Sequence, residues 1–151
     1  MVTTTISPRE LVGQVPDPEL PFLSIADLGI VRKVEMEGSL VRVSITPTYS
    51  GCPALDAIKT DIERVLIDHG YEPEVALALS PPWTTDDLSD RARVLLADNG
   101  FAPPQSEEAV VCPRCAAAPV RMVSRFGSTA CKALMVCSAC REPFDLFKEL
   151  R

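Results

Sequence analysis

The clearest alternation of apolar and polar residues along the chain lies in segment 40–46 (LVRVSIT), where every second side chain from Val41 onward is apolar. This period of two is typical of a β-strand with one buried face. Segment 30–36 (IVRKVEM) precedes it, and the polar turn at 37–39 (EGS) predicts a hairpin between the two segments. Segment 74–79 (EVALAL) predicts a third strand.

Apolar residues recur at helical spacing in three further segments, at about 7–15, 52–69 and 84–100. The first of these has the strongest start signal. Ser7 suits the N-cap, and Glu10 stands three residues later, at the capping-box position. A short helix is therefore expected near the N-terminus.

The second helix is expected to open at Cys52-Pro53, because proline is favoured in the first turn, and to end at Gly70. The third is expected to run without interruption from a cap at Thr84 or Thr85 to Gly100. Two aspartates in its first turn suit the helix dipole.

The order α-β-β-α-β-α over the first hundred residues predicts an α+β fold, with a small three-stranded sheet and helices packed against it. Residues 1–106 carry 8 basic and 16 acidic side chains, whereas residues 107–151 carry 7 and 5. Segment 101–109 is rich in proline and polar residues, as linkers are. We predict a domain at 1–104, a linker at 105–110 and a four-cysteine module at 111–151.

The composition of the 151 residues excludes several classes of protein. The net charge of −6 and the 5% aromatic content argue against a general nucleic-acid binder, which must neutralise phosphates and stack on bases. No apolar run approaches the ~20 residues of a membrane span. The first 15 residues lack the basic and apolar regions of a secretory signal, so we expect a cytoplasmic protein.

Five of the six cysteines lie in the last 40 residues. Cys112 with Cys115 and Cys137 with Cys140 form two C-x2-C knuckles, 21 residues apart. Four thiolates with no open position are the ligand set of structural zinc, and reduced thiols are normal in the cytoplasm. A redox or iron–sulfur role and disulfide bonds remain as alternatives.

A zinc ribbon most simply stabilises a fold and presents a surface. This end of the chain is locally basic, since Arg114, Arg121, Arg125 and Lys132 lie here. A nucleic-acid role therefore stays open, although the acidic chain as a whole opposes it. Cys131 is the odd thiol of the module and would replace a ligand, lie buried or be redox-active; burial is commonest for a free cysteine.

Cys52 stands alone in the sequence. At a helix start, unpaired N–H groups and the helix dipole favour its thiolate, so it is the best candidate for a reactive thiol. Thr46, Thr48 and Ser50 precede it and would donate hydrogen bonds nearby. The alternative is a small buried apolar side chain.

Other candidate residues have simple structural interpretations. Asp17 and Glu19 flank a proline and would either help to hold a transient metal or cap a turn. Asp27 is expected in a turn, and His69 at a helix end. The sequence contains no Ser-His-Asp arrangement, HExxH motif, P-loop or GxGxxG motif, so no catalytic set of its own is predicted.

Four short motifs in residues 7–104 together resemble the DUF59 family, which includes iron–sulfur assembly factors. They are DPE at 17–19, DLGIV at 27–31, GCP at 51–53 and PPWT at 81–84. The resemblance implies that Cys52 is the functional thiol, tied to delivery of iron or an iron–sulfur cluster. It also implies that Asp17 and Glu19 belong to the same site. Thr48, from its position shortly before Cys52, and Cys131, as the odd thiol, are the other supporting candidates.

The C-terminal segments CPRC, SRFGSTACKALMVCSAC and EPFDLFK resemble the zinc-binding tail of the PaaD (PaaJ) family of aerobic phenylacetate catabolism. This resemblance implies an accessory subunit of the multicomponent phenylacetyl-CoA monooxygenase (1,2-epoxidase), a di-iron enzyme. The expected partners are its di-iron subunit or its iron–sulfur reductase, and a homo-oligomer stays open. A purely structural adaptor without metal transfer is the alternative function.

Overall fold

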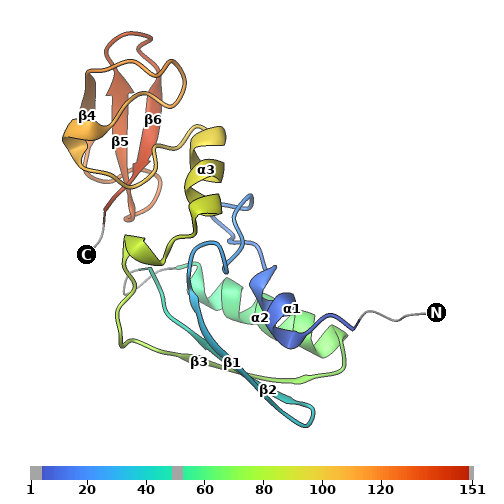
Figure 1. The fold of residues 1–151 in the computed structure, drawn as a ribbon. Helices are drawn as coiled ribbons and strands as arrows, with labels where there is room; N and C mark the ends of the chain where they lie inside the picture. Colours follow the sequence, from blue (N-terminus) through green and yellow to red (C-terminus); the bar gives the residue numbers. More distant parts are fainter. Residues whose placement is uncertain (1–4, 49–52, 150–151) are drawn as a thin grey trace. The chain divides into compact units, whose positions relative to one another are not determined.

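The computed structural model describes residues 5–48 and 53–149 (Figure 1). The chain divides into two units, residues 1–83 and 84–151, and each unit is described by itself. Cys52, the predicted reactive thiol, lies outside the described residues. None of the helices in the described part combines the length and the apolar character that crossing a bilayer requires.

The N-terminal unit is built on a three-stranded sheet of order β1-β2-β3, with β1 at Val31–Glu37, β2 at Leu40–Ile45 and β3 at Glu72–Leu77. The β1–β2 hairpin is antiparallel and turns through Gly38, whose φ is +61°. β3 runs parallel to β2, so the chain must cross back between them through a helix. The three predicted strands are confirmed, each within about two residues.

Helices α1 (Pro8–Gly13) and α2 (Leu55–Asp68) belong to this unit, and α2 makes the crossover from β2 to β3 (Figure 1). The Ser7 side chain accepts from Glu10 N at 3.2 Å, and the Glu10 carboxylate accepts from Ser7 N at 2.9 Å, so the predicted capping box is present. The core takes the alternating residues of β2 and the apolar stripe of α2. These fully buried residues are Val41, Val43, Ile45, Ile58, Ile62 and Leu66.

The predicted start of the second helix is wrong by two residues. α2 begins at Leu55 rather than at Cys52-Pro53, and Pro53 lies in the turn before it. Ala54 already has helical φ and ψ, but its methyl group caps no backbone N–H. The helix therefore starts without a side-chain cap. Its predicted end is confirmed, because His69 is the C-cap and Gly70 has a φ of +84°.

The C-terminal unit begins with two short helices where one was predicted. A 3-10 turn, η1 (Thr85–Asp87), is capped by Thr84, and α3 (Asp90–Asp98) follows it. Leu88 between them is extended and buried. The uninterrupted helix is wrong because Ser89 supplies a second N-cap, its hydroxyl accepting from Ala92 N at 3.0 Å.

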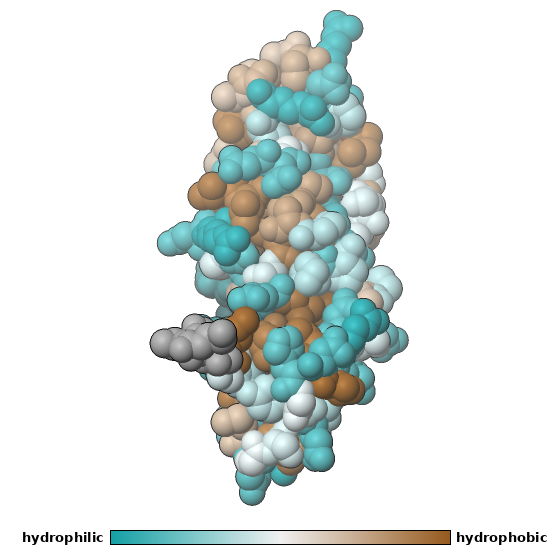
Figure 2. All heavy atoms as spheres, turned by 90° about the vertical axis from the view of Figure 1, so that its right-hand side faces the viewer, coloured by the Kyte–Doolittle hydropathy of each residue, from teal (hydrophilic) through white to brown (hydrophobic). Residues whose placement is uncertain are grey.

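Three antiparallel strands form the second sheet in the order β4-β5-β6, with β4 at Val120–Ser124, β5 at Lys132–Cys137 and β6 at Pro143–Phe147. Its core includes Met135 and Phe144. On the face of the molecule that Figure 2 shows, apolar and hydrophilic side chains are interspersed.

Segment 101–110 is attached to this second sheet. Ala102 N donates to Asp145 O and Phe147 N donates to Ala102 O, both at 2.9 Å, so Ala102 extends the sheet beyond β6. Val110 joins the same core, after the 3-10 turn η2 (Glu107–Ala109). The domain boundaries expected from the sequence, with a linker at 105–110, stay a prediction.

Candidate metal centre

The four knuckle cysteines converge at one end of the second sheet. Cys112 and Cys115 lie in the turn that leads to β4, while Cys137 ends β5 and Cys140 lies in the turn toward β6. All four Sγ atoms lie within 4.8 Å of one another. The structure thus brings together the four cysteines of the two C-x2-C motifs, as the sequence predicts.

The sulfur spacing fits a tetrahedral metal ion. Four thiolates with Zn–S bonds of about 2.3 Å place neighbouring sulfurs about 3.8 Å apart. The Cys112 and Cys140 sulfurs are 3.7 Å apart, and the Cys115 and Cys137 sulfurs 3.6 Å. A disulfide bond is about 2.04 Å long, and all four are free thiols. The donor set therefore suits zinc rather than cross-linking.

Both knuckles have the same backbone geometry. Ala116 N donates to Cys112 O at 2.8 Å, and Arg141 N donates to Cys137 O at 3.0 Å. Ala116 and Arg141, each directly after the second cysteine of its knuckle, have φ values of 61° and 63°. These are the only non-glycine residues of the described chain in the left-handed region, which side chains rarely adopt. The knuckles thus fold by repeating one strained turn.

Backbone N–H groups point at the buried sulfurs. Arg114 N donates to Cys112 Sγ at 3.4 Å, while Ala139 N and Cys140 N donate to Cys137 Sγ at 3.3 and 3.4 Å. The N–H groups of Cys140 and then Ala139 outweigh burial and lower the pKa of Cys137 to about 6. Its thiolate therefore exists at neutral pH, ready for a cation.

The pKa of Cys140 moves in the opposite direction. The Glu142 N–H lowers it, but burial and the adjoining sulfurs outweigh that effect and raise it to about 12. Four crowded thiols cannot all ionise without a cation between them, so some protons stay until a metal displaces them.

Cys131 does not belong to the four-sulfur cluster. It precedes β5, at the far end of that strand from Cys137, and is 7% exposed. Its sulfur lies 2.9 Å from the Thr129 hydroxyl.

Lys132, one of the four basic residues that kept a nucleic-acid role open, is only 3% exposed. Its Nζ donates to Ser128 Oγ at 3.2 Å and lies 5.2 Å from the centre of the Phe101 ring. The attraction of the ammonium to the face of the ring, the hydrogen bond to Ser128 and the long apolar stem make this burial tolerable. Sequence gives no signal for it, because Phe101 precedes Lys132 by 31 positions.

The other predicted site residues belong to the N-terminal unit. Asp17 is buried, and its Oδ1 accepts from Glu19 N at 2.9 Å and from Leu20 N at 2.8 Å, so it fixes a turn. Glu19 and Thr48 are half-buried. A shared site with Cys52 stays a prediction for all three, because Cys52 is outside the described residues.

Thr46 has a different role from the one expected. Its hydroxyl donates to Ala78 O at 2.6 Å and accepts from Arg32 Nε at 3.0 Å. The single hydroxyl proton is therefore used, and Thr46 ties β1 to the end of β3. No signal in the sequence pointed to Arg32.

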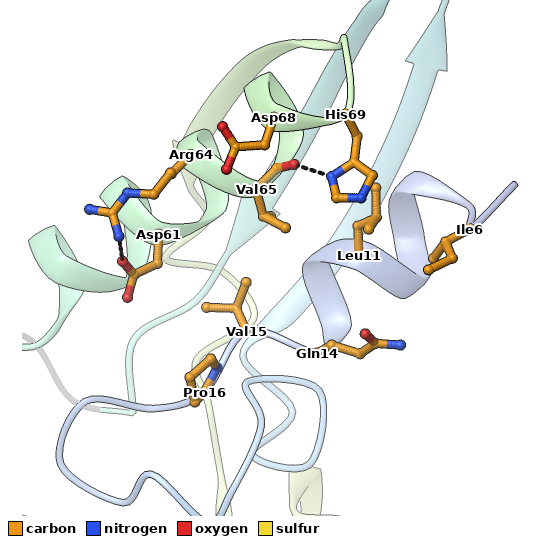
Figure 3. A pocket seen from close by; sticks show the side chains of 10 residues that line it. All are labelled: Ile6, Leu11, Gln14, Val15, Pro16, Asp61, Arg64, Val65, Asp68 and His69. Carbon is orange, nitrogen blue, oxygen red and sulfur yellow. Dashed lines mark hydrogen bonds and ion pairs between the residues drawn. The ribbon is translucent and has the colours of Figure 1, made fainter.

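Asp27 and His69 are confirmed as turn and helix-end residues. The Asp27 carboxylate accepts from the Ser24 hydroxyl at 3.0 Å. His69 Nδ1 lies 2.8 Å from Val65 O. The His69 side chain also lines a groove of about 610 Å³ between α1 and α2 (Figure 3). Of the predicted site residues within the described part, none lines this groove.

Comparison with known families matches both units. Residues 9–76 match the family described as iron–sulfur cluster assembly protein, and residues 97–148 match the PaaD zinc beta ribbon domain. The first match ends before the second sheet begins, and the second includes all four knuckle cysteines.

Curated relatives match over different lengths. A putative 1,2-phenylacetyl-CoA epoxidase subunit of Escherichia coli K12 is 46% identical over 91% of this chain and 88% of its own length. The Fe-S protein maturation auxiliary factor YitW of Bacillus subtilis 168 is 37% identical over 55% of this chain and 83% of its own.

A crystal structure of a DUF59 domain from Bacillus anthracis has 30% identity and a TM-score of 0.54, covering 59% of this chain and 87% of that one. The relatives are named as an epoxidase subunit and as a maturation auxiliary factor, and the N-terminal match is to an assembly family, so an accessory rather than a catalytic role is indicated. The α+β class predicted from the sequence is confirmed. The chain belongs to the PaaD family, with an iron–sulfur cluster assembly domain at residues 9–76 and a zinc β-ribbon at residues 97–148.

Proposed function

We propose that this protein is an accessory subunit of a phenylacetyl-CoA epoxidase that helps to assemble its iron or iron–sulfur cofactor. One observation carries the proposal. The segment that resembles Fe-S maturation factors is joined, in one chain, to a ribbon found in a relative named as an epoxidase subunit. A maturation domain fused to a dedicated recognition module is suited to one client.

Cys52 is the residue that would carry the cargo. It follows β2 and precedes α2 in the sequence, and cysteine thiolates are the ligands that hold iron–sulfur clusters in proteins. Asp17, Glu19 and Thr48 are the supporting residues of this proposed site. Asp17 would act mainly by holding the turn, because its Oδ1 already accepts two backbone N–H groups.

Zinc in the ribbon would be a resident ion with a structural role. Cys112, Cys115, Cys137 and Cys140 would hold it, and structural zinc supplies about 10–16 kcal/mol of coupled binding and folding energy. The second sheet has a small core, so the ion would complete it. The stabilised ribbon then presents a surface to the oxygenase, whose di-iron subunit or iron–sulfur reductase is the expected partner. We propose that the protein acts in the cytoplasm, where cysteine thiols stay reduced.

The deciding experiment is elemental analysis after anaerobic co-expression with the other epoxidase subunits, comparing wild type with Cys52→Ser. The proposal expects about one zinc per chain in both proteins and less iron per assembled epoxidase with Cys52→Ser. Cys131→Ser tests the other supporting candidate. This buried thiol should leave iron loading unchanged, which would remove it from the proposed site. Equal iron content with Cys52→Ser would overturn metal transfer and favour the structural adaptor.

A further inference from the structure

The two sulfur pairs of the metal centre differ in accessibility. Each knuckle contributes one buried and one exposed cysteine: Cys112 and Cys137 are each 1% exposed, whereas Cys115 and Cys140 are exposed residues. A tetrahedral ion held here would have a protected edge and a solvent-facing edge. Reagents in solution reach the second edge first.

Hydrogen bonds sharpen this difference. Three backbone N–H groups donate to the buried sulfurs of Cys112 and Cys137. On Cys140 the Glu142 N–H acts alone. Within the described part of the chain, no backbone N–H is seen to donate to Cys115 Sγ, whose polar contacts are the sulfurs of Cys137 and Cys140. An N–H donor withdraws electron density from a thiolate and makes it a weaker nucleophile.

We infer that Cys115 is the modification site of the metal centre, attacked first by hydroperoxides, and that Cys140 then closes a disulfide with it and releases the metal. This inference rests on the zinc site of the proposed function. Cys115 and Cys140 are the two exposed thiols of the cluster, and their sulfurs lie within 4.8 Å of each other. Closure from at most 4.8 Å to a disulfide length of about 2.04 Å brings the two sulfurs together by less than about 3 Å.

The chemistry balances with one equivalent of hydrogen peroxide. The Cys115 thiolate attacks one peroxide oxygen and takes up OH, giving a sulfenic acid, while the other oxygen leaves as hydroxide and is protonated to water. The Cys140 thiolate then attacks the sulfenic sulfur, and hydroxide leaves and takes a proton from solvent to become the second water. Two thiolates lose two electrons and peroxide gains them. The two buried thiolates that remain are too few to hold structural zinc, which needs four ligands.

The test uses the zinc-loaded, full-length Cys52→Ser protein, so that the predicted reactive thiol of the other unit makes no contribution. Substoichiometric hydrogen peroxide is added, zinc release is followed with a chromogenic chelator, and remaining thiols are trapped with N-ethylmaleimide for peptide mass spectrometry. We expect Cys115 to be lost at least five times faster than Cys112, a Cys115–Cys140 disulfide, and zinc release at the same rate as disulfide formation. Buried Cys131 is the internal control and should keep its thiol.

Equal loss of all four thiols, a disulfide between Cys112 and Cys137, or zinc retained after Cys115 is oxidised would each overturn the inference. Iodoacetamide gives an independent measure of nucleophilicity, and it should label Cys115 before Cys112. The peroxide experiment measures zinc release and thiol loss, and it does not measure iron loading of the epoxidase. Failure of this inference therefore leaves the proposed maturation role intact. Absence of bound zinc at the start would instead contradict the zinc site itself.

Discussion

The indole Nε1 of Trp83 donates a 2.7 Å hydrogen bond to the carbonyl oxygen of Leu28, 55 residues earlier in the chain. Both residues are buried. They belong to two of the motifs that mark the DUF59 resemblance, DLGIV at 27–31 and PPWT at 81–84. The motifs are thus coupled physically, because one supplies the acceptor and the other the donor.

Trp83→Phe should destabilise the N-terminal unit by about 1–3 kcal/mol, because the ring stays apolar but the buried Leu28 carbonyl loses its donor. Urea unfolding followed by circular dichroism measures the change. Leu79→Ala is the control: this side chain is 68% exposed, so the expected effect is below about 0.5 kcal/mol. Equal stability of Trp83→Phe and wild type would show that water replaces the indole donor.

Zinc binding at pH 7 should release fewer than four protons per chain. Cys137, with its pKa lowered to about 6, is already a thiolate, whereas Cys140, with its pKa raised to about 12, still holds its proton. As pH falls below 6, Cys137 is protonated in the metal-free protein, so the number released should rise. Calorimetry in buffers of different ionisation enthalpy counts these protons. A number that is constant between pH 5.5 and 7.5 would contradict the assigned thiolate.

Ala116→Gly should stabilise the zinc-loaded ribbon by about 1 kcal/mol. Ala116 has a φ of 61°, and a residue with a Cβ atom in the left-handed region costs roughly 1–2 kcal/mol. Glycine removes this cost, but part of the gain is offset because glycine has a higher conformational entropy in the unfolded chain. Thermal unfolding at saturating zinc tests the effect. Ala57→Gly in α2 is the matched control and should destabilise by about 1 kcal/mol, since it lies within a helix. A destabilised Ala116→Gly would mean that the methyl group packs usefully.

A fragment of residues 97–151 should fold on adding zinc, whereas a fragment of residues 111–151 should stay poorly ordered. The shorter piece lacks Ala102, which pairs with β6, and Val110, which fills the core. Amide chemical-shift dispersion distinguishes the two outcomes. Equal dispersion in both fragments would support the domain boundary that the sequence predicts.

Local signals in the sequence were sufficient for much of the fold. The Ser7–Glu10 capping box and the alternation in β2 depend on neighbouring residues only, so they could be predicted. The knuckle cysteines could be paired because their spacing constrains them. The break before α3 was missed because Thr84 and Ser89 both act as caps, one for η1 and one for α3, and the buried, extended Leu88 separates the two elements.

Interactions between distant segments could not be predicted. The burial of Lys132 depends on Phe101, and the use of the Thr46 hydroxyl depends on Arg32 and on the carbonyl of Ala78. A charged or polar side chain seen alone in a sequence is assumed to face water, so its tertiary partner stays hidden.

The pairing of Ala102 with β6 also sets the order of events while the protein is being made. Ala102 leaves the ribosome well before Phe147, which donates to its carbonyl. The first unit has its whole sequence available earlier and is free to fold during synthesis. The ribbon is different, because Cys137, Cys140 and Phe147 lie within eleven consecutive residues, so its second knuckle and its last strand become available almost together.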